Sequence, residues 1–191
     1  MMRFFLLLVC LTFLCGCLTL EHSLRLTEGN ALVAGYVYVY DTDAEPAMAA
    51  GLEEMGGVAW RFFDEAKVRA SLAERKLELV RYRKIAHAGR TTVEISVMTR
   101  DFAKSLKEGA FPGMEWTRGD TSVLSLQMPE ANLPKKTVER LKKVCPGFRA
   151  SLTIAVPGTI VETNGRRLDA STAVWEYAFG DAVVAPRLSW R

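Results

Sequence analysis

Apolar and polar residues alternate with a period of two along much of the chain, a pattern typical of antiparallel strands with one buried face. Residues 91–99 show it most clearly, because Val93, Ile95 and Val97 alternate with polar neighbours. The same pattern predicts further strands, at 23–27, 31–40, 77–86, 114–117, 122–128, 149–156, 159–163, 174–179 and 182–185. Residues that favour turns separate neighbouring strands, so the pattern predicts a series of β-hairpins.

Three of the connections between strands have sequences that predict a turn. Asn164-Gly165 is a strong tight-turn signal, because both residues tolerate a positive φ. Residues 87–90 are expected to close a hairpin between two long strands. Arg118-Gly119-Asp120 matches a known cell-attachment tripeptide, but glycine and aspartate are also ordinary turn residues, and a hairpin turn is the preferred interpretation.

A period near 3.6 predicts helices between the hairpins. The first follows Thr42 or Asp43. The second is expected over 59–75, with a buried stripe formed by Ala59, Phe62, Phe63, Ala66, Ala70 and Ala73. Asp101 is expected to cap a short third helix, and Pro134 to open a fourth that ends near Cys145. Hairpins interleaved with helices indicate an α+β fold, in which an antiparallel, strongly curved and partly barrel-like sheet packs on two to four helices.

The first seventeen residues have the pattern of an export signal. Arg3 supplies a positive charge, and residues 4–14 form an apolar run that is too short to span a bilayer. Leu14-Cys15-Gly16-Cys17 then resembles a lipobox, the motif at which bacterial lipoproteins are linked to diacylglycerol and cut before the modified cysteine. The resemblance implies that Cys17 is lipidated. The expected segments are a signal peptide at 1–16, a lipidated N-terminus and tether at 17–23, and a single α+β domain at 24–191.

Two other interpretations of this segment are less favoured. Under an ordinary secretory signal, Cys17 would only lie near the cut site. A transmembrane anchor is disfavoured because Glu21, His22 and Arg25 end the apolar run too early. The expected location is therefore the bacterial cell envelope, through a lipid anchor. Leu18 stands where an aspartate would favour inner-membrane retention in enteric bacteria, which implies the outer membrane, facing the periplasm.

Removal of the signal peptide would also change the number of free cysteines and the net charge. Cys10 and Cys15 leave with it and Cys17 carries lipid, so Cys145 remains as a lone thiol, either buried or available for an intermolecular bond. Burial is the preferred alternative for Cys145. The chain has 25 basic and 22 acidic residues, a net charge of +3 that loss of Arg3 lowers by one. A general nucleic-acid binder would be more basic, so no nucleic-acid partner is expected.

The C-terminal third resembles the LppM-like lipoprotein domain. The resemblance rests on Pro-Gly at 157–158, a short strand, Asn164-Gly165, and a strand that contains Trp175. Residues 89–95, followed by Asp101-Phe102, fit the middle hairpin of the family. The resemblance implies a β-rich, partly barrel-like envelope lipoprotein that binds envelope lipids or glycolipids in the hollow between sheet and helix. It transfers no individual binding residue, because its motifs are turns and core positions.

Enzyme signatures are missing from the sequence. It contains no Gly-x-Ser-x-Gly, His-Glu-x-x-His, phosphate-loop or Ser-x-x-Lys motif, so neither an enzyme, a cofactor nor a metal is expected. The two histidines, His22 beside the anchor and His87 in a turn, are both expected at the surface.

Two sets of residues are candidates for binding. Five basic residues of the predicted fourth helix could lie against anionic lipid headgroups, with an ordinary solvated face as the alternative: Lys135, Lys136, Arg140, Lys142 and Lys143. A second set could line an acyl-chain pocket, with an ordinary hydrophobic core as the alternative: Met48, Leu52, Met55, Phe62, Phe63 and Trp175.

These patterns together predict a membrane-anchored, non-enzymatic envelope lipoprotein that binds envelope lipid or glycolipid. The alternative is a structural or assembly lipoprotein that contacts other envelope proteins through exposed sheet edges. The sequence predicts neither the identity of a ligand nor that of a protein partner.

Overall fold

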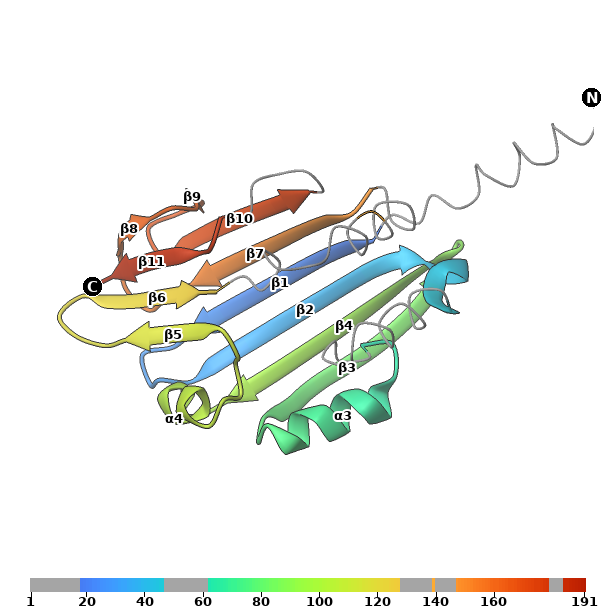
Figure 1. Cartoon of the computed structure of the whole chain (residues 1–191), viewed down its shortest axis with the longest axis horizontal. Coiled ribbons are helices and arrows are strands. Elements are labelled where there is room, and N and C mark those ends of the chain that lie inside the picture. The colour runs from blue at the N-terminus through green and yellow to red at the C-terminus, as the bar shows by residue number, and fades with distance from the viewer. Residues whose placement is uncertain (1–17, 47–61, 128–138, 140–146, 179–183) are drawn as a thin grey trace, which may run out of the picture.

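The computed structural model describes residues 18–46, 62–127, 139, 147–178 and 184–191, and these form two β-sheets with helices beside them (Figure 1). The larger sheet has the strand order β3-β4-β2-β1-β7-β10-β9. Its strands are β1 (Thr19–Leu26), β2 (Leu32–Asp41), β3 (Glu78–His87), β4 (Arg90–Thr99), β7 (Arg149–Ala155), β9 (Arg166–Arg167) and β10 (Thr172–Ala178). The smaller sheet has the order β5-β6-β11-β8, from β5 (Met114–Thr117), β6 (Ser122–Leu126), β11 (Arg187–Trp190) and β8 (Ile160–Thr163).

The strand β1 lies in the middle of the larger sheet. It pairs antiparallel with β2 and parallel with β7, so both of its edges are hydrogen-bonded. Because β1 begins at Thr19, the prediction of a tether over 17–23 is wrong for residues 19–23. Long-range pairing with β7 extends the strand toward the N-terminus, and local sequence patterns do not report such a partner.

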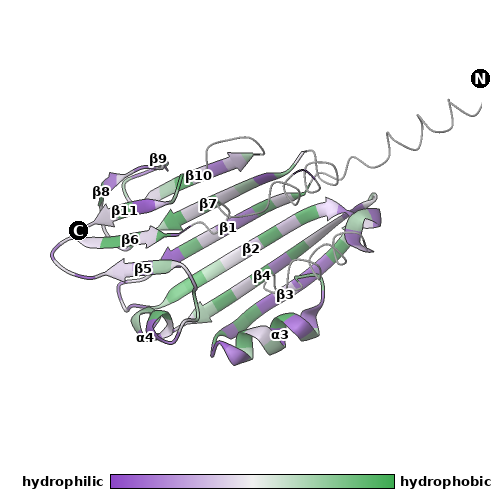
Figure 2. Ribbon diagram, in the orientation of Figure 1, coloured by the Kyte–Doolittle hydropathy of each residue, from purple (hydrophilic) through white to green (hydrophobic). Residues whose placement is uncertain are grey.

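The central hairpins follow the alternation of the sequence. Val93, Ile95 and Val97 are each at most 1% exposed, which confirms the buried face predicted for β4. The β3–β4 turn consists of Ala88 and Gly89, both at positive φ (49° and 77°). Such a turn matches the right-handed twist of the strands it joins, so it fixes their register. Figure 2 shows the resulting bands of apolar and polar residues along the strands.

The core lies between the two sheets. Leu124, Ile160, Leu188 and Trp190 of the smaller sheet belong to one buried cluster with the apolar residues of the larger sheet. Figure 1 shows the smaller sheet over one end of the larger sheet, the end beside α4 (Phe102–Lys107). As expected, the Asp101 side chain caps α4 by accepting a hydrogen bond from the backbone of Lys104 (3.0 Å).

The α+β class is consistent with these elements, but the sheets are open, so the prediction of a partly barrel-like sheet is wrong. The expectation of two to four helices is not confirmed either. Within the described residues the helices are α3 (Glu65–Glu74), α4 and the 3₁₀ turn η1 (Thr42–Ala44). Twist over many strands curves a sheet strongly without closing it, and a sequence pattern does not distinguish the two outcomes.

The helix α3 begins later and faces the core differently than predicted. The Asp64 side chain caps it by accepting a hydrogen bond from the backbone of Lys67 (3.2 Å). Its buried residues are Val68 and Leu72, whereas the alanines of the predicted stripe at 66, 70 and 73 are exposed. A short helix buries only a narrow stripe of side chains. Burial of the larger apolar side chains at spacing i, i+4 is more favourable in free energy than burial of alanine.

Asn164-Gly165 does not form the predicted positive-φ turn. It joins β8 of the smaller sheet to β9 of the larger one, and neither residue has a positive φ. A Cβ added at Gly165 would lie 2.5 Å from Cε2 of Trp175, so the glycine makes room for the indole ring. Asn164 Oδ1 accepts hydrogen bonds from Trp175 Nε1 (3.0 Å) and from the backbone of Arg187 (2.9 Å). The motif therefore links the two sheets.

This link leads to a prediction about stability. We expect Asn164→Ala to lower the free energy of unfolding by about 2 kcal/mol, because it leaves the buried Trp175 Nε1 without an acceptor. Asn164→Asp keeps the acceptor oxygen and loses only the bond that Nδ2 donates to the carbonyl of Ala185 (2.8 Å), so it serves as the control, with a smaller loss expected in urea denaturation. An equal loss in both variants would contradict the assigned hydrogen bond.

The last predicted strand, at 182–185, differs from the structure in its described part. Residues 184–185 are not in a strand, and β11 runs from Arg187 to Trp190 and pairs with both β6 and β8. Leu188 and Trp190 of β11 face the core, at 1% and 5% exposure. The position of this short strand is set by its pairing with β6 and β8, which are distant in the sequence, and a local pattern does not report such partners.

Candidate ligand-binding face

One transverse row of side chains crosses the core-facing side of the larger sheet. The register places His22 opposite Tyr36 on β2, and Tyr36 and Tyr82 each opposite Ile95 on β4. In the other direction His22 lies opposite Leu152, which lies opposite Trp175. The next core-facing positions of β2 are Tyr38 and Tyr40, so three tyrosines follow one another on the same side of this strand.

Around this row the aromatic rings pack closely. We use the term aromatic face for His22, Tyr36, Tyr38, Tyr40, Phe62 and Tyr82. Phe62 stacks on Tyr38 with a centroid distance of 4.0 Å and contacts Tyr40 edge-on at 5.9 Å. His22 meets Tyr36 edge-on at 4.9 Å. Aromatic pairs in these geometries contribute beyond the area that they bury.

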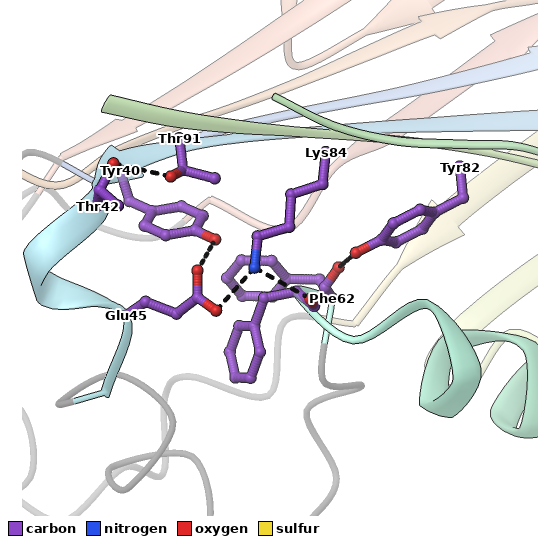
Figure 3. Close-up of polar contacts among 8 residues, drawn as sticks. Tyr40, Thr42, Glu45, Phe62, Tyr82, Lys84 and Thr91 are labelled. Carbon is purple, nitrogen blue, oxygen red and sulfur yellow. Dashed lines mark hydrogen bonds and ion pairs between the residues drawn. The ribbon is translucent and has the colours of Figure 1, made fainter. Parts of the chain in front are cut away.

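Polar contacts hold one end of the aromatic face (Figure 3). The Tyr40 hydroxyl donates to Glu45 Oε2 (2.7 Å), and Lys84 Nζ donates to Glu45 Oε1 (2.7 Å) and to the carbonyl of Phe63 (3.3 Å). The Tyr82 hydroxyl donates to the carbonyl of Phe62 (3.0 Å). Two side chains of β3, Tyr82 and Lys84, thus hold the backbone of Phe62 and Phe63 against the sheet.

The environment keeps these tyrosines neutral. Burial raises the pKa of Tyr36 and of Tyr82 to about 12, and in Tyr82 nearby carboxylates add to the effect. Burial and the hydrogen bond to Glu45 raise the pKa of Tyr40 as well. Burial alone would raise the pKa of Glu45, but the hydrogen bonds from Lys84 and Tyr40 lower it below its ordinary value. The face therefore presents neutral rings beside one ion pair.

His22 was expected at the surface, and this expectation is wrong. The residue is half-buried, its Nε2 atom has no hydrogen-bond partner, and burial lowers its pKa from 6.5 to about 4. His22 lies an even number of positions from Leu20, Leu24 and Leu26 along β1, so its side chain is on the same, core-facing side of the strand. His87, in contrast, is exposed as expected.

The structure brings together only part of the predicted pocket. Phe62 and Phe63 lie at the aromatic face, whereas Trp175 lies three strands from Tyr36 and packs on Gly165. The other candidates lie outside the described residues: Cys17, Met48, Leu52, Met55, Lys135, Lys136, Arg140, Lys142, Lys143 and Cys145. Sequence reasoning missed His22 and the three tyrosines of β2, although their period-two spacing along the two strands was visible.

A groove of about 660 Å³ lies on the opposite face of the larger sheet. Ser23, Gly35, Ser96 and Thr153 lie in one row across β1, β2, β4 and β7, and they contribute to its lining. Arg25 and Val33 border this row. Small side chains leave space above the strands, so the groove is shallow and mixed in character, unlike the aromatic face.

The described residues contain neither a cluster of metal-ligating side chains nor a membrane-spanning helix. Among them, no group of three or more His, Cys, Asp or Glu side chains is placed to hold a metal ion. In the same ranges, no helix is long and apolar enough to cross a membrane.

Comparison with known proteins supports the fold. No protein-family model and no curated protein sequence matches the chain. Among solved structures, the chain is similar to the NMR structure of the folded domain of LppM from Mycobacterium tuberculosis. The match covers 92% of this chain and 91% of that chain, with a TM-score of 0.53 and 14% sequence identity. At this identity the likeness concerns the fold alone, and the expectation of an LppM-like fold is confirmed.

Proposed function

We propose that the protein is a non-enzymatic, membrane-anchored lipoprotein of the bacterial cell envelope that binds an envelope lipid or glycolipid at the aromatic face. The anchor is the lipidated Cys17, and the proposed location is the outer membrane, facing the periplasm. The lipobox-like run before Cys17 and the identity of Leu18 support this part of the proposal.

The observation that carries the ligand proposal is the composition of the aromatic face. The partly buried rings of Tyr36 and Tyr82 offer contact area to acyl chains, with the buried rings of the face behind them, and sites for small molecules combine such surfaces with a few polar groups. His22 Nε2 supplies one unpaired polar atom, and the Glu45–Lys84 pair supplies charges at one end. A hydroxyl or ester of a lipid would satisfy Nε2, which otherwise costs free energy when buried.

Native mass spectrometry tests this proposal. The lipidated protein is purified from its membrane in mild detergent, and we expect lipid to co-purify in addition to the acyl groups on Cys17. A charge in the aromatic face, in Tyr36→Arg, should abolish the co-purified lipid. The neighbouring Val37→Arg places the same charge on the opposite side of β2 and should retain it. An empty wild-type protein, or equal loss in two folded variants, would contradict the proposal.

A second candidate function, an assembly lipoprotein that contacts other envelope proteins, is favoured by a different observation. The strand β3 forms one edge of the larger sheet, and Val80 at its bulge is 55% exposed. An exposed edge can accept a strand from a partner. Retention of lipid after substitutions in β3, with loss of a co-purified protein, would favour this function. The basic residues at 135–143 stay a prediction under either function.

A further inference from the structure

The distance along the chain between the proposed anchor and the folded sheet is very short. β1 begins at Thr19, and the carbonyl of Leu18 already accepts a hydrogen bond from the backbone of Arg149 (3.1 Å). The Leu18 side chain packs, partly buried, against the core. Since consecutive Cα atoms are about 3.8 Å apart, Cys17 is bonded directly to a residue that belongs to the folded domain.

We infer that the end of the larger sheet at which β1 begins lies against the lipid headgroups. This inference rests on the proposed lipidation of Cys17. Acyl chains hold their cysteine at the membrane surface, so the next residue stays at headgroup level. β1 is paired on both sides and cannot extend as a spacer without breaking the sheet.

Several segments share this end of the sheet. The register aligns Thr19 with Val39 of β2 and with Arg149 of β7. η1 and the Ala88-Gly89 turn follow at the same end, and Figure 1 shows them beside the start of β1. The exposed side chains here include His87, Arg90 and Arg149, together with the acidic Asp43. Arg149 can approach anionic headgroups, whereas Arg90 is ion-paired with Asp41 (3.9 Å).

The burial of the core-facing side also changes along the sheet. Under the smaller sheet, Leu24, Leu26 and Leu32 are at most 5% exposed. Toward the start of β1, Leu18 and Leu20 are only partly buried. The Tyr40–Glu45–Lys84 contacts lie at this same end. Leu18 and Leu20 are therefore the less buried core-facing side chains nearest the anchor, whereas Tyr38 and Tyr40 at this end are at most 4% exposed.

Site-directed fluorescence quenching tests the orientation. The lipidated full chain, in a Cys145→Ala background, carries a bimane label on Ala88→Cys or on Gly119→Cys. Ala88 lies at the anchored end, and Gly119 lies in the β5–β6 loop at the other end. In phosphatidylglycerol-containing vesicles with headgroup nitroxide lipids, we expect several-fold stronger quenching at position 88. A long Gly-Ser linker inserted between Cys17 and Leu18 should abolish the difference.

The outcomes separate this inference from the proposed function. Mass spectrometry of the same sample reports whether Cys17 carries acyl chains, and an unmodified Cys17 overturns both the anchor and the orientation. With Cys17 acylated, equal quenching at the two positions, or stronger quenching at position 119, overturns the orientation alone. With the linker inserted, an unchanged difference shows that another surface sets the orientation, and this also overturns the inference.

Discussion

Phe62→Ala is expected to lower the free energy of unfolding by about 3–5 kcal/mol, the loss typical of a buried phenylalanine. Phe62 is 5% exposed and stacks on Tyr38 at a centroid distance of 4.0 Å. Its removal takes away ring contacts with Tyr40 and Phe63 as well, and it leaves a cavity above β2. Urea denaturation of a soluble Cys17→Ser protein measures the loss.

Phe63→Ala is the matched control for this prediction. Phe63 is the adjacent residue of the same type but is only half-buried, so a smaller loss of about 1 kcal/mol is expected. If both residues lined a ligand pocket and did not contribute to packing, both substitutions would change the free energy of unfolding by the same small amount. That result would contradict the assignment of Phe62 to the packed aromatic face.

Acidification is expected to destabilise the protein through His22. Burial lowers the folded-state pKa of His22 from 6.5 to about 4, so between these values the unfolded chain binds more protons than the folded one. The stabilising contribution is therefore complete above the ordinary pKa and is lost as the pH falls from 6.5 toward 4. The full loss is on the order of 3 kcal/mol, from the size of the shift.

The comparison with His22→Leu isolates this effect from the carboxylates that titrate in the same range. The difference in unfolding free energy between wild type and His22→Leu should change steadily as the pH falls from 7 to 4, in favour of the variant. Parallel pH profiles for the two proteins would show that His22 titrates normally and is not desolvated.

The sequence predicted those elements whose information is local. The β3–β4 hairpin, the buried face of β4 and the Asp101 cap follow from alternation and from residues within a few positions of each other. The order of the strands could not be predicted in this way, because the parallel pairing of β1 with β7 joins residues far apart in the sequence. The same pairing extends β1 to Thr19 and removes the expected tether.

Asn164-Gly165 and His22 show why a local pattern can mislead. The dipeptide has the composition of a tight turn, but its role comes from Trp175 and Arg187, which approach it in the folded protein. Because histidine is polar and His22 follows an export signal, composition favours a surface position. Its place on the same side of β1 as Leu20 and Leu24 instead directs it toward the core. The candidate site could be anticipated only at Phe62 and Phe63, because its other members come from separate strands.

Mapping a bound lipid by NMR tests the central proposal most directly. The soluble Cys17→Ser protein is titrated with a phospholipid that carries a nitroxide on its acyl chain. We predict that the resonances of His22, Tyr36 and Phe62 broaden first. Ser23, Gly35 and Thr153, in the groove on the opposite side of the sheet, should broaden much less. Stronger broadening in that groove, or no broadening at either face, would contradict lipid binding at the aromatic face.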